Sequence, residues 1–232
     1  MTTRRARRAQ AMGAAMTLAC GLGVASPVLA HPHVFIDTGV EAIFDDEGQL
    51  AALQVVWVYD EFYSMMAIDD YGLDPEFTGE LTEDERVELA EIYSNWVEGY
   101  DGDLYALHAG ERVDLSGPLE VEADLNDGRI TISLVRALEE RLDPGVEPVT
   151  LRVYDPSYFT LYTIAREPTI HGRDDCTAEA HGPDLEAAEA RLQEELDQMT
   201  EQGLDSWEIE QDFPAVGAEF AEEIRLTCAA SS

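Results

Sequence analysis

The sequence contains no lysine, and its 14 arginines face 49 aspartates and glutamates, which leaves the 232-residue chain with a net charge of −35. Charge of this sign repels phosphate backbones and anionic lipid headgroups, so it argues against nucleic-acid binding and against direct lipid binding. Low hydrophobicity does not accompany the charge, because 45% of the residues are hydrophobic and 8% are aromatic. We therefore expect a folded protein with a packed core, whose natural ligands are cations.

Long apolar segments are also missing, since none reaches the roughly 20 residues that a membrane-spanning helix requires. The apolar stretch at 11–25 is shorter, follows a basic start with four arginines and precedes the small-residue pattern Val28-Leu29-Ala30. This is the pattern of a secretory signal peptide, and we expect residues 1–30 to be cleaved from an exported protein. Cys20 leaves a lipoprotein as an alternative, but Thr17 stands where a lipobox requires leucine.

Removal of residues 1–30 takes away four arginines and no acidic residue, so the expected mature chain has 10 arginines, 49 acidic residues and a net charge of −39 over 202 residues. A lysine-free acidic surface stays hydrated in a medium whose ions screen its self-repulsion. We interpret the charge as adaptation to salt, in preference to an acidic functional surface.

Cysteine is scarce, and only Cys176 and Cys228 remain in the expected mature chain. In an oxidising compartment the two are expected to form a disulfide. Thiolate metal ligation is the less favoured alternative, because the sequence has no closely spaced CxxC pair.

Motifs that carry catalysis are absent. The sequence shows no nucleophile with its base, no helical H-E-x-x-H zinc motif and no glycine-rich phosphate loop. Carboxylates are so numerous that any proposed acid and base pair would be arbitrary. We therefore expect a protein that is not an enzyme.

The hydrophobic pattern predicts an α+β fold with antiparallel sheet, a helical insertion at about 60–100 and a peripheral C-terminal helix, all within a single domain at 31–232. Strands are predicted at 33–44, 50–59, 103–109, 118–125, 129–138, 149–155, 158–166 and 220–228, the first two forming a hairpin. Helices are predicted at 60–71, at 82–100 with a capping box of Thr82 and Glu85, and at 185–199. Residues 172–184 are expected to be turn-rich, and Trp57, Met65 and Met66 are assigned to the core.

Two histidines mark the expected mature N-terminus, where His31 would be the first residue and His33 the third. An N-terminal histidine can chelate a transition metal through its α-amine and imidazole, and a second imidazole adds a further nitrogen ligand suited to zinc, nickel or copper. Pro32 has no N–H to lose, which excludes a square-planar site built from deprotonated backbone amides. A site completed by carboxylates is the favoured hypothesis, against the alternative that both histidines merely lead into a strand.

A second candidate site spans Asp74 to Glu85, which fits an EF-hand calcium frame with Gly79 at position six and Glu85 at position twelve. The candidate calcium ligands are Asp74, Glu76, Thr78, Glu80 and Glu85. Glutamate at position three and threonine at position five weaken the match. The favoured alternative is an ordinary loop that leads into the capping box.

The remaining histidines offer weaker candidates. His108 lies in a predicted strand, and His171 and His181 flank Cys176 in a polar segment that could serve as an accessory metal-loading loop. A copper enzyme that uses the N-terminal histidine would need a further histidine from afar, with His108 or His171 as the obvious donors.

Five segments together resemble one known family: H-P-H-V-F-I-D (31–37), V-V-W-V-Y-D-E-F-Y-S (55–64), L-T-E-D-E (81–85), V-Y-D-P-S-Y-F (153–159) and F-A-E-E-I-R-L-T-C (220–228). They resemble an uncharacterised periplasmic family, a domain of unknown function, described as the periplasmic component of an ABC-type transport system. Members of that family often accompany NicO-type nickel, cobalt or zinc permeases.

The resemblance implies a periplasmic accessory protein that holds or delivers a divalent transition metal, zinc, nickel or cobalt, beside an inner-membrane permease. By position it implies that the residues to test first are His31, His33, Asp60, Glu61 and Asp155. The rival hypothesis is a salt-adapted structural or interaction protein of the cell envelope, with a degenerate EF-hand-like calcium loop and an incidental histidine pair.

Overall fold

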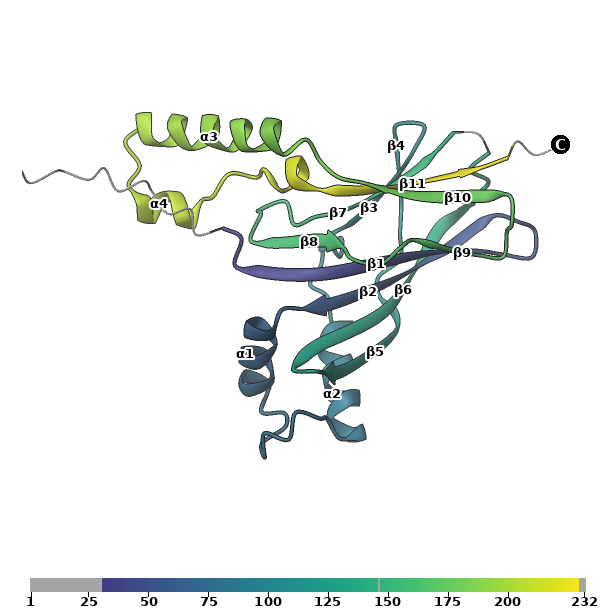
Figure 1. The fold of residues 1–232 in the computed structure, drawn as a ribbon, viewed down its shortest axis with the longest axis horizontal. Helices are drawn as coiled ribbons and strands as arrows, with labels where there is room; N and C mark the ends of the chain where they lie inside the picture. The colour runs from purple at the N-terminus through teal and green to yellow at the C-terminus, as the bar shows by residue number, and fades with distance from the viewer. Residues whose placement is uncertain (1–30, 146, 230–232) are drawn as a thin grey trace, which may run out of the picture.

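The computed structural model describes residues 31–145 and 147–229, so the predicted signal peptide at 1–30 lies outside the described residues. The fold is α+β, as predicted, with two β-sheets, a pair of helices inserted after the second strand and a helical arm near the C-terminus (Figure 1). The inserted helices and the C-terminal arm lie at different places around the sheets (Figure 1).

The first sheet has the strand order β5-β6-β2-β1-β8, with β9 also paired to β1. Its strands are β1 (Val34–Phe44), β2 (Leu50–Tyr59), β5 (Leu119–Asn126), β6 (Arg129–Leu142), β8 (Thr160–Ile164) and β9 (Thr169–His171). The predicted hairpin joins β1 to β2. Pairing is antiparallel except at β8 and β9, which run parallel to β1. Strand β1 therefore lies inside the sheet, with β2 on one side and β8 and β9 on the other.

The second sheet is antiparallel, in the order β10-β11-β7-β3-β4. Its strands are β3 (Leu104–His108), β4 (Glu111–Val113), β7 (Val149–Val153), β10 (Cys176–His181) and β11 (Glu222–Cys228). Strand β10 lies in the segment predicted to be turn-rich, so that part of the prediction was wrong. Its sequence is polar because its side chains are exposed or only partly buried.

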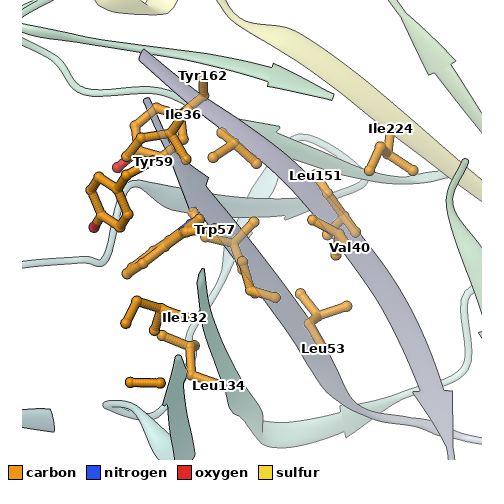
Figure 2. Close-up of a cluster of buried hydrophobic side chains, with 14 of the residues drawn as sticks. Ile36, Val40, Leu53, Trp57, Tyr59, Ile132, Leu134, Leu151, Tyr162 and Ile224 are labelled. Carbon is orange, nitrogen blue, oxygen red and sulfur yellow. The ribbon is translucent and has the colours of Figure 1, made fainter. Parts of the chain in front are cut away.

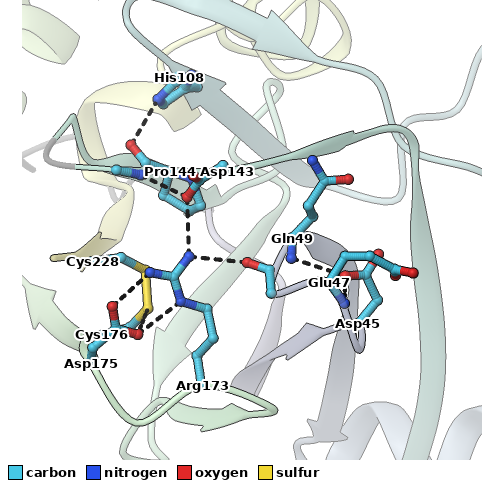
Figure 3. Close-up of polar contacts among 12 residues, drawn as sticks. Asp45, Glu47, Gln49, His108, Asp143, Pro144, Arg173, Asp175, Cys176 and Cys228 are labelled. Atoms are coloured by element: carbon cyan, nitrogen blue, oxygen red, sulfur yellow. Dashed lines mark hydrogen bonds and ion pairs between the residues drawn. A yellow bond between two sulfur atoms is a disulfide. The ribbon is translucent and has the colours of Figure 1, made fainter. Parts of the chain in front are cut away.

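The predicted disulfide is confirmed, because Cys176 on β10 lies opposite Cys228 on β11 and the two sulfur atoms are bonded (Figure 3). Arg173 forms hydrogen bonds with three loops beside this disulfide. Its guanidinium donates to the carbonyl of Gly48 and to Oδ1 of Asp143, both at 3.0 Å, and to both carboxylate oxygens of Asp175 (Figure 3). The disulfide joins two neighbouring strands of the second sheet, and Arg173 connects the end of that sheet to the loops after β1 and β6 of the first.

The helical insertion consists of α1 (Glu61–Tyr71) and α2 (Glu83–Ser94), and the predicted capping box of Thr82 and Glu85 is present. The prediction that the second helix continues to residue 100 was wrong. The chain leaves the helix before Trp96, whose ring packs 6.2 Å from that of Trp57 and beneath the guanidinium of Arg136 at 4.8 Å. The aromatic spacing beyond Ser94 therefore reflects contacts with the core and not a longer helix.

The main core lies between the two sheets, where side chains of β1, β2, β6 and β8 meet residues of β7 and β11 (Figure 2). Trp57 is buried there, as predicted. The assignment of Met65 and Met66 to the core was wrong, since their exposed fractions are 62% and 43%. Helix α1 instead buries its other side, which carries Ser64, Ala67 and Ile68.

The C-terminal arm consists of α3 (Leu185–Glu201), α4 (Ser206–Gln211) and the short helix η1 (Gly217–Phe220). It has a hydrophobic cluster of its own, formed by Ala188, Leu192, Val216 and Phe220. Helix α3 is peripheral, as predicted (Figure 1). Among the described residues, no helix combines the length and apolar character needed to cross a membrane.

Candidate metal centre

Three potential metal ligands converge where the chain enters β1. Nε2 of His33 lies 3.0 Å from Oε1 of Glu210, and Nδ1 of His31 lies 3.5 Å from the same oxygen. The two imidazole rings meet edge to face with their centroids 4.7 Å apart. One ligand atom from each residue falls within 4.8 Å of the other two, which makes this trio a candidate metal centre.

The backbone of Phe159 holds the histidine pair in place. Its carbonyl accepts hydrogen bonds from the backbone N–H of His33 and of Val34, at 2.8 and 3.2 Å. Phe159 in turn follows a turn organised by Asp155, whose carboxylate accepts from the backbone N–H of Ser157 and of Thr160. Asp155 therefore helps to position the residues just before β1, which include both histidines.

The arm packs directly against this turn. The backbone N–H of Gly217 donates to the carbonyl of Pro156, and a side-chain carbon at Gly217 would fall 1.7 Å from the carbonyl oxygen of Asp155. Only glycine allows this close approach. The contact sets the position of the segment between α4 and η1 relative to the histidines.

Glu210 reaches the centre from α4, a helix that the sequence interpretation missed. The signal was present, because Asp205 caps the backbone N–H of Glu208 while the Glu208 side chain accepts from the Asp205 N–H. This D-x-x-E pattern is a capping box and predicts a helix start. Even with α4 predicted, nothing local to the sequence pairs Glu210 with a histidine 177 residues away.

His31 is the more enclosed of the two histidines, with a side chain that is 5% exposed against 36% for His33. The ring of Phe213 stacks on it, and Phe159 lies edge-on at 6.0 Å. Burial lowers the pKa of His31, although the Glu210 carboxylate acts in the opposite direction. The neutral imidazole, which is the form that ligates metals, is therefore favoured.

The donor set suits a borderline transition metal. Bonds of about 2.0–2.1 Å to a tetrahedral zinc ion place neighbouring ligand atoms roughly 3.4 Å apart, close to the separations from Glu210 to the two imidazoles. Nδ1 of His31 is buried and makes no hydrogen bond to any of the described residues, which is costly unless another partner satisfies it. Two imidazoles and a carboxylate fit zinc, nickel or cobalt better than calcium, which prefers six to eight oxygen ligands.

The other residues that the resemblance implied lie outside this trio. Asp60 caps α1 by accepting from the N–H of Tyr63, and its second oxygen accepts from the N–H of Phe35 at 2.9 Å. Glu61 is exposed in the first turn of α1. The oxygens of Asp60 therefore accept from the starts of α1 and β1, and those of Asp155 accept from its own turn and the start of β8.

The group of potential ligands that converges among the described residues, His31, His33 and Glu210, includes no residue of the candidate calcium loop. Asp74 accepts from the backbone N–H of Thr78 and of Gly79, which lowers its pKa, and Glu85 accepts from the N–H of Asp74 and of Thr82. Glu76 and Glu80 are exposed on the surface. These hydrogen bonds form the capped loop that was the alternative interpretation, and calcium binding by the loop stays a prediction.

The other histidines lie apart from the centre. His108 contacts the carbonyl of Pro144 (Figure 3), His171 pairs with Glu41 at 2.7 Å, and His181 lies 3.9 Å from Glu179. The further histidine that a copper enzyme would require is not among the three residues brought together in the described part of the chain.

Comparison with known proteins places the chain in a family without assigning an activity. No curated protein matches the sequence. One family model, that of a protein of unknown function (DUF1007), matches residues 16–228 and so covers both sheets, the inserted helices and the arm that carries Glu210. The chain belongs to the DUF1007 family.

Proposed function

We propose that this protein is a periplasmic carrier that binds a divalent transition metal, zinc, nickel or cobalt, as cargo and works with an inner-membrane permease of the NicO type. The convergence of His31, His33 and Glu210 on one point is the observation that carries the proposal. Three side-chain ligands leave a tetrahedral ion one further position, which water or another ligand would fill. The resemblance drawn from the sequence supports the compartment and the permease.

The expected cleavage after Ala30 would add a fourth ligand. It would free the α-amine of His31, and Nδ1, the nitrogen that faces Glu210, is the one that closes a six-membered chelate ring with that amine. Asp60 and Asp155 would support metal binding without contacting the metal. Their hydrogen bonds hold the start of β1 and the neighbouring turn, which position the histidines. Substitution of a residue that orients a metal ligand typically lowers the metal affinity by about 10- to 100-fold.

The proposal is tested by competition titration of protein that begins at His31 with zinc, nickel, cobalt, copper and calcium. The variants His33→Ala and Glu210→Gln each remove one ligand, and we expect affinity to fall by more than the 10- to 100-fold typical of supporting residues. His171→Ala and Glu201→Gln are matched controls, because they remove an exposed histidine and an exposed carboxylate elsewhere. A variant with one extra residue before His31 measures the contribution of the α-amine.

Each outcome bears on the proposal. Tight binding that both ligand variants weaken and both controls retain supports it. Calcium binding alone, unaffected by His33→Ala, would move the function to the loop at 74–85. Absence of transition-metal binding would overturn the proposal in favour of the envelope interaction protein.

A further inference from the structure

Helix α1 carries apolar residues on two opposite sides, and only one of these sides is buried against the rest of the protein. Ser64, Ala67 and Ile68 are buried, and Oγ of Ser64 accepts from the N–H of Ile130 on β6 at 2.9 Å. The outer side carries Phe62, Met65 and Met66 with exposed fractions of 63%, 62% and 43%. The spacing of these three residues places them on one face of the helix. A contiguous exposed apolar cluster on a helix marks an interaction surface, so this face lacks a covering partner among the described residues.

The loop after α1 adds a fourth exposed apolar side chain. Phe77 is 85% exposed and its backbone has a φ of 53°, a conformation that bulky residues rarely adopt. Asp74 enforces it by accepting from Thr78 and Gly79 while its own N–H donates to Glu85. The carboxylates of the EF-hand-like frame therefore hold a rigid loop that presents Phe77, and strain of this kind is typical of functional positions.

A cleft of about 680 Å³ lies between α1, this loop and the turn that joins β5 to β6. Its apolar lining includes Met65, Met66, Leu73, Phe77 and Leu125. The volume is within the range of sites that accept apolar side chains or small ligands. Methionine adapts its shape to different partners, which suits a surface that receives helices.

The charge around the cleft selects the partner. Residues 60–85 contain ten acidic residues and no arginine or lysine, and Asp69 lines the cleft itself. A segment of this charge repels acidic segments and anionic lipid, and it attracts cationic ones. An apolar cleft within such a segment, lined by Asp69 and Asp74, is complementary to a helix that is apolar on one face and basic on the other.

We propose that the outer face of α1, together with Phe77, is a docking surface for a basic amphipathic helical segment of a partner protein. The surface is separate from the candidate metal centre, because α1 and α4 lie at different places around the sheets (Figure 1). This proposal goes beyond metal binding and can succeed or fail independently of it. Its natural partner chemistry is a juxtamembrane or loop helix rich in lysine and arginine.

The test uses a fluorescent 18-residue helix with leucine on one face and lysine on the other, titrated with the purified protein at about 0.15 M salt. An otherwise identical peptide with glutamate in place of lysine reports on the charge argument. The double variant Met65→Gln/Phe77→Ser removes the apolar anchors, and we expect it to bind at least about 10-fold more weakly, a typical effect of removing hot-spot residues. The matched control is Val97→Gln, which removes an exposed apolar side chain elsewhere.

Methionine oxidation locates the bound peptide. Mild peroxide should oxidise Met65 and Met66 in the free protein, and the lysine peptide should protect them while leaving the half-buried Met199 unchanged. Circular dichroism and thermal melting confirm that the variants are folded.

Four outcomes would overturn the proposal: no binding of the lysine peptide, equal binding of both peptides, undiminished binding by the double variant, or no protection of Met65 and Met66. Sedimentation and flotation with phosphatidylglycerol vesicles distinguish the other occupants. Self-association or vesicle binding that the double variant abolishes, without peptide binding, would assign the face to a second copy or to lipid instead.

Discussion

The ring of Phe213 lies face to face with the imidazole of His31, with centroids 3.8 Å apart and planes 3° from parallel. Phe213 follows α4, the helix that supplies Glu210, so the arm both contributes a candidate ligand and covers the buried histidine. The arm packs through its own hydrophobic cluster, apart from the main core. Completion of the candidate centre therefore depends on how the arm docks against the entry to β1.

Substitution of Phe213→Ala should uncover His31. Because burial is the main cause of its lowered pKa, we expect the pKa to rise toward the ordinary value near 6.5. Proton competition would then weaken metal binding more at pH 6 than at pH 8. Titration of the histidine ring signals by NMR in metal-free protein checks the shift. Trp207→Ala, which removes a 68% exposed aromatic ring from α4, is the control and should leave the titration unchanged.

Asp60→Ala should lower the free energy of unfolding by about 1–2 kcal/mol, because it removes the cap of α1. The bond to the Phe35 N–H is lost as well. Asp60→Ser keeps a capping oxygen and should be less destabilising, and Glu61→Ala should have little effect. Urea denaturation measures all three. A loss of metal affinity in Asp60→Ala far beyond 100-fold would instead identify Asp60 as a ligand.

Asp103 should make stability depend on pH in the mildly acidic range. Its buried carboxylate accepts from Tyr100 and Tyr162, and burial raises its pKa to about 6. The protonated form is favoured in the folded state, so this contribution is present below the unfolded pKa and is lost as pH rises through about 6. Asp103→Asn, which stays neutral, should gain stability relative to the wild type by on the order of 2–3 kcal/mol between pH 4 and pH 7.

Denaturation of the wild type and of Asp103→Asn at several pH values checks this difference. Asparagine tolerates the positive φ of 51° at this position. A stability difference that did not change with pH would contradict the assignment.

Loss of the disulfide should be costly because it closes a loop of 52 residues. The double variant Cys176→Ser/Cys228→Ser should be less stable by about 4 kcal/mol on the chain-entropy account. Wild-type protein denatured in the presence of dithiothreitol should match the double variant. Equal midpoints for oxidised and reduced protein would show that the bond adds nothing to stability.

Salt should stabilise the fold. With a net charge of −39 over residues 31–232, self-repulsion is strong at low ionic strength, and raising the salt from 0.1 M to 1 M shortens the screening length from about 10 to 3 Å. We expect Tm to rise along a series of KCl concentrations. Tm values that stay constant or fall would rule out the interpretation of the acidic composition as salt adaptation.

Local patterns predicted most of the fold. The alternation of hydrophobic and polar residues in β1 and β2, and the capping box at Thr82, each depend only on residues close together in the sequence. The structure confirms both strands and the capping box. The extended prediction for α2 failed because Trp96 continues the helical spacing although its ring is held by Trp57 and Arg136 from distant strands. Strand β10 was missed because its pairing with β11, and not its own composition, makes it a strand.

Only part of the candidate centre was accessible from the sequence. The histidine pair stands out because of its place at the expected mature N-terminus. Glu210 is one of many glutamates, and only the docking of the arm brings it to His33. The resemblance implied Asp60 and Asp155 as metal-site residues, but the hydrogen bonds that occupy their oxygens depend on tertiary contacts and on turn geometry, which the sequence does not show.

The first and last strands of the described residues are both interior strands, because β1 lies between β2 and β8, and β11 lies between β10 and β7. The second sheet is therefore incomplete until residues 222–228 have been synthesised. In the first sheet, β1 and its parallel partner β8 are about 125 residues apart in the sequence. Pairings this distant in sequence slow folding. A nascent chain therefore lacks an interior strand of the second sheet until its synthesis reaches β11, and a truncation that removed residues 222–228 would separate β10 from β7.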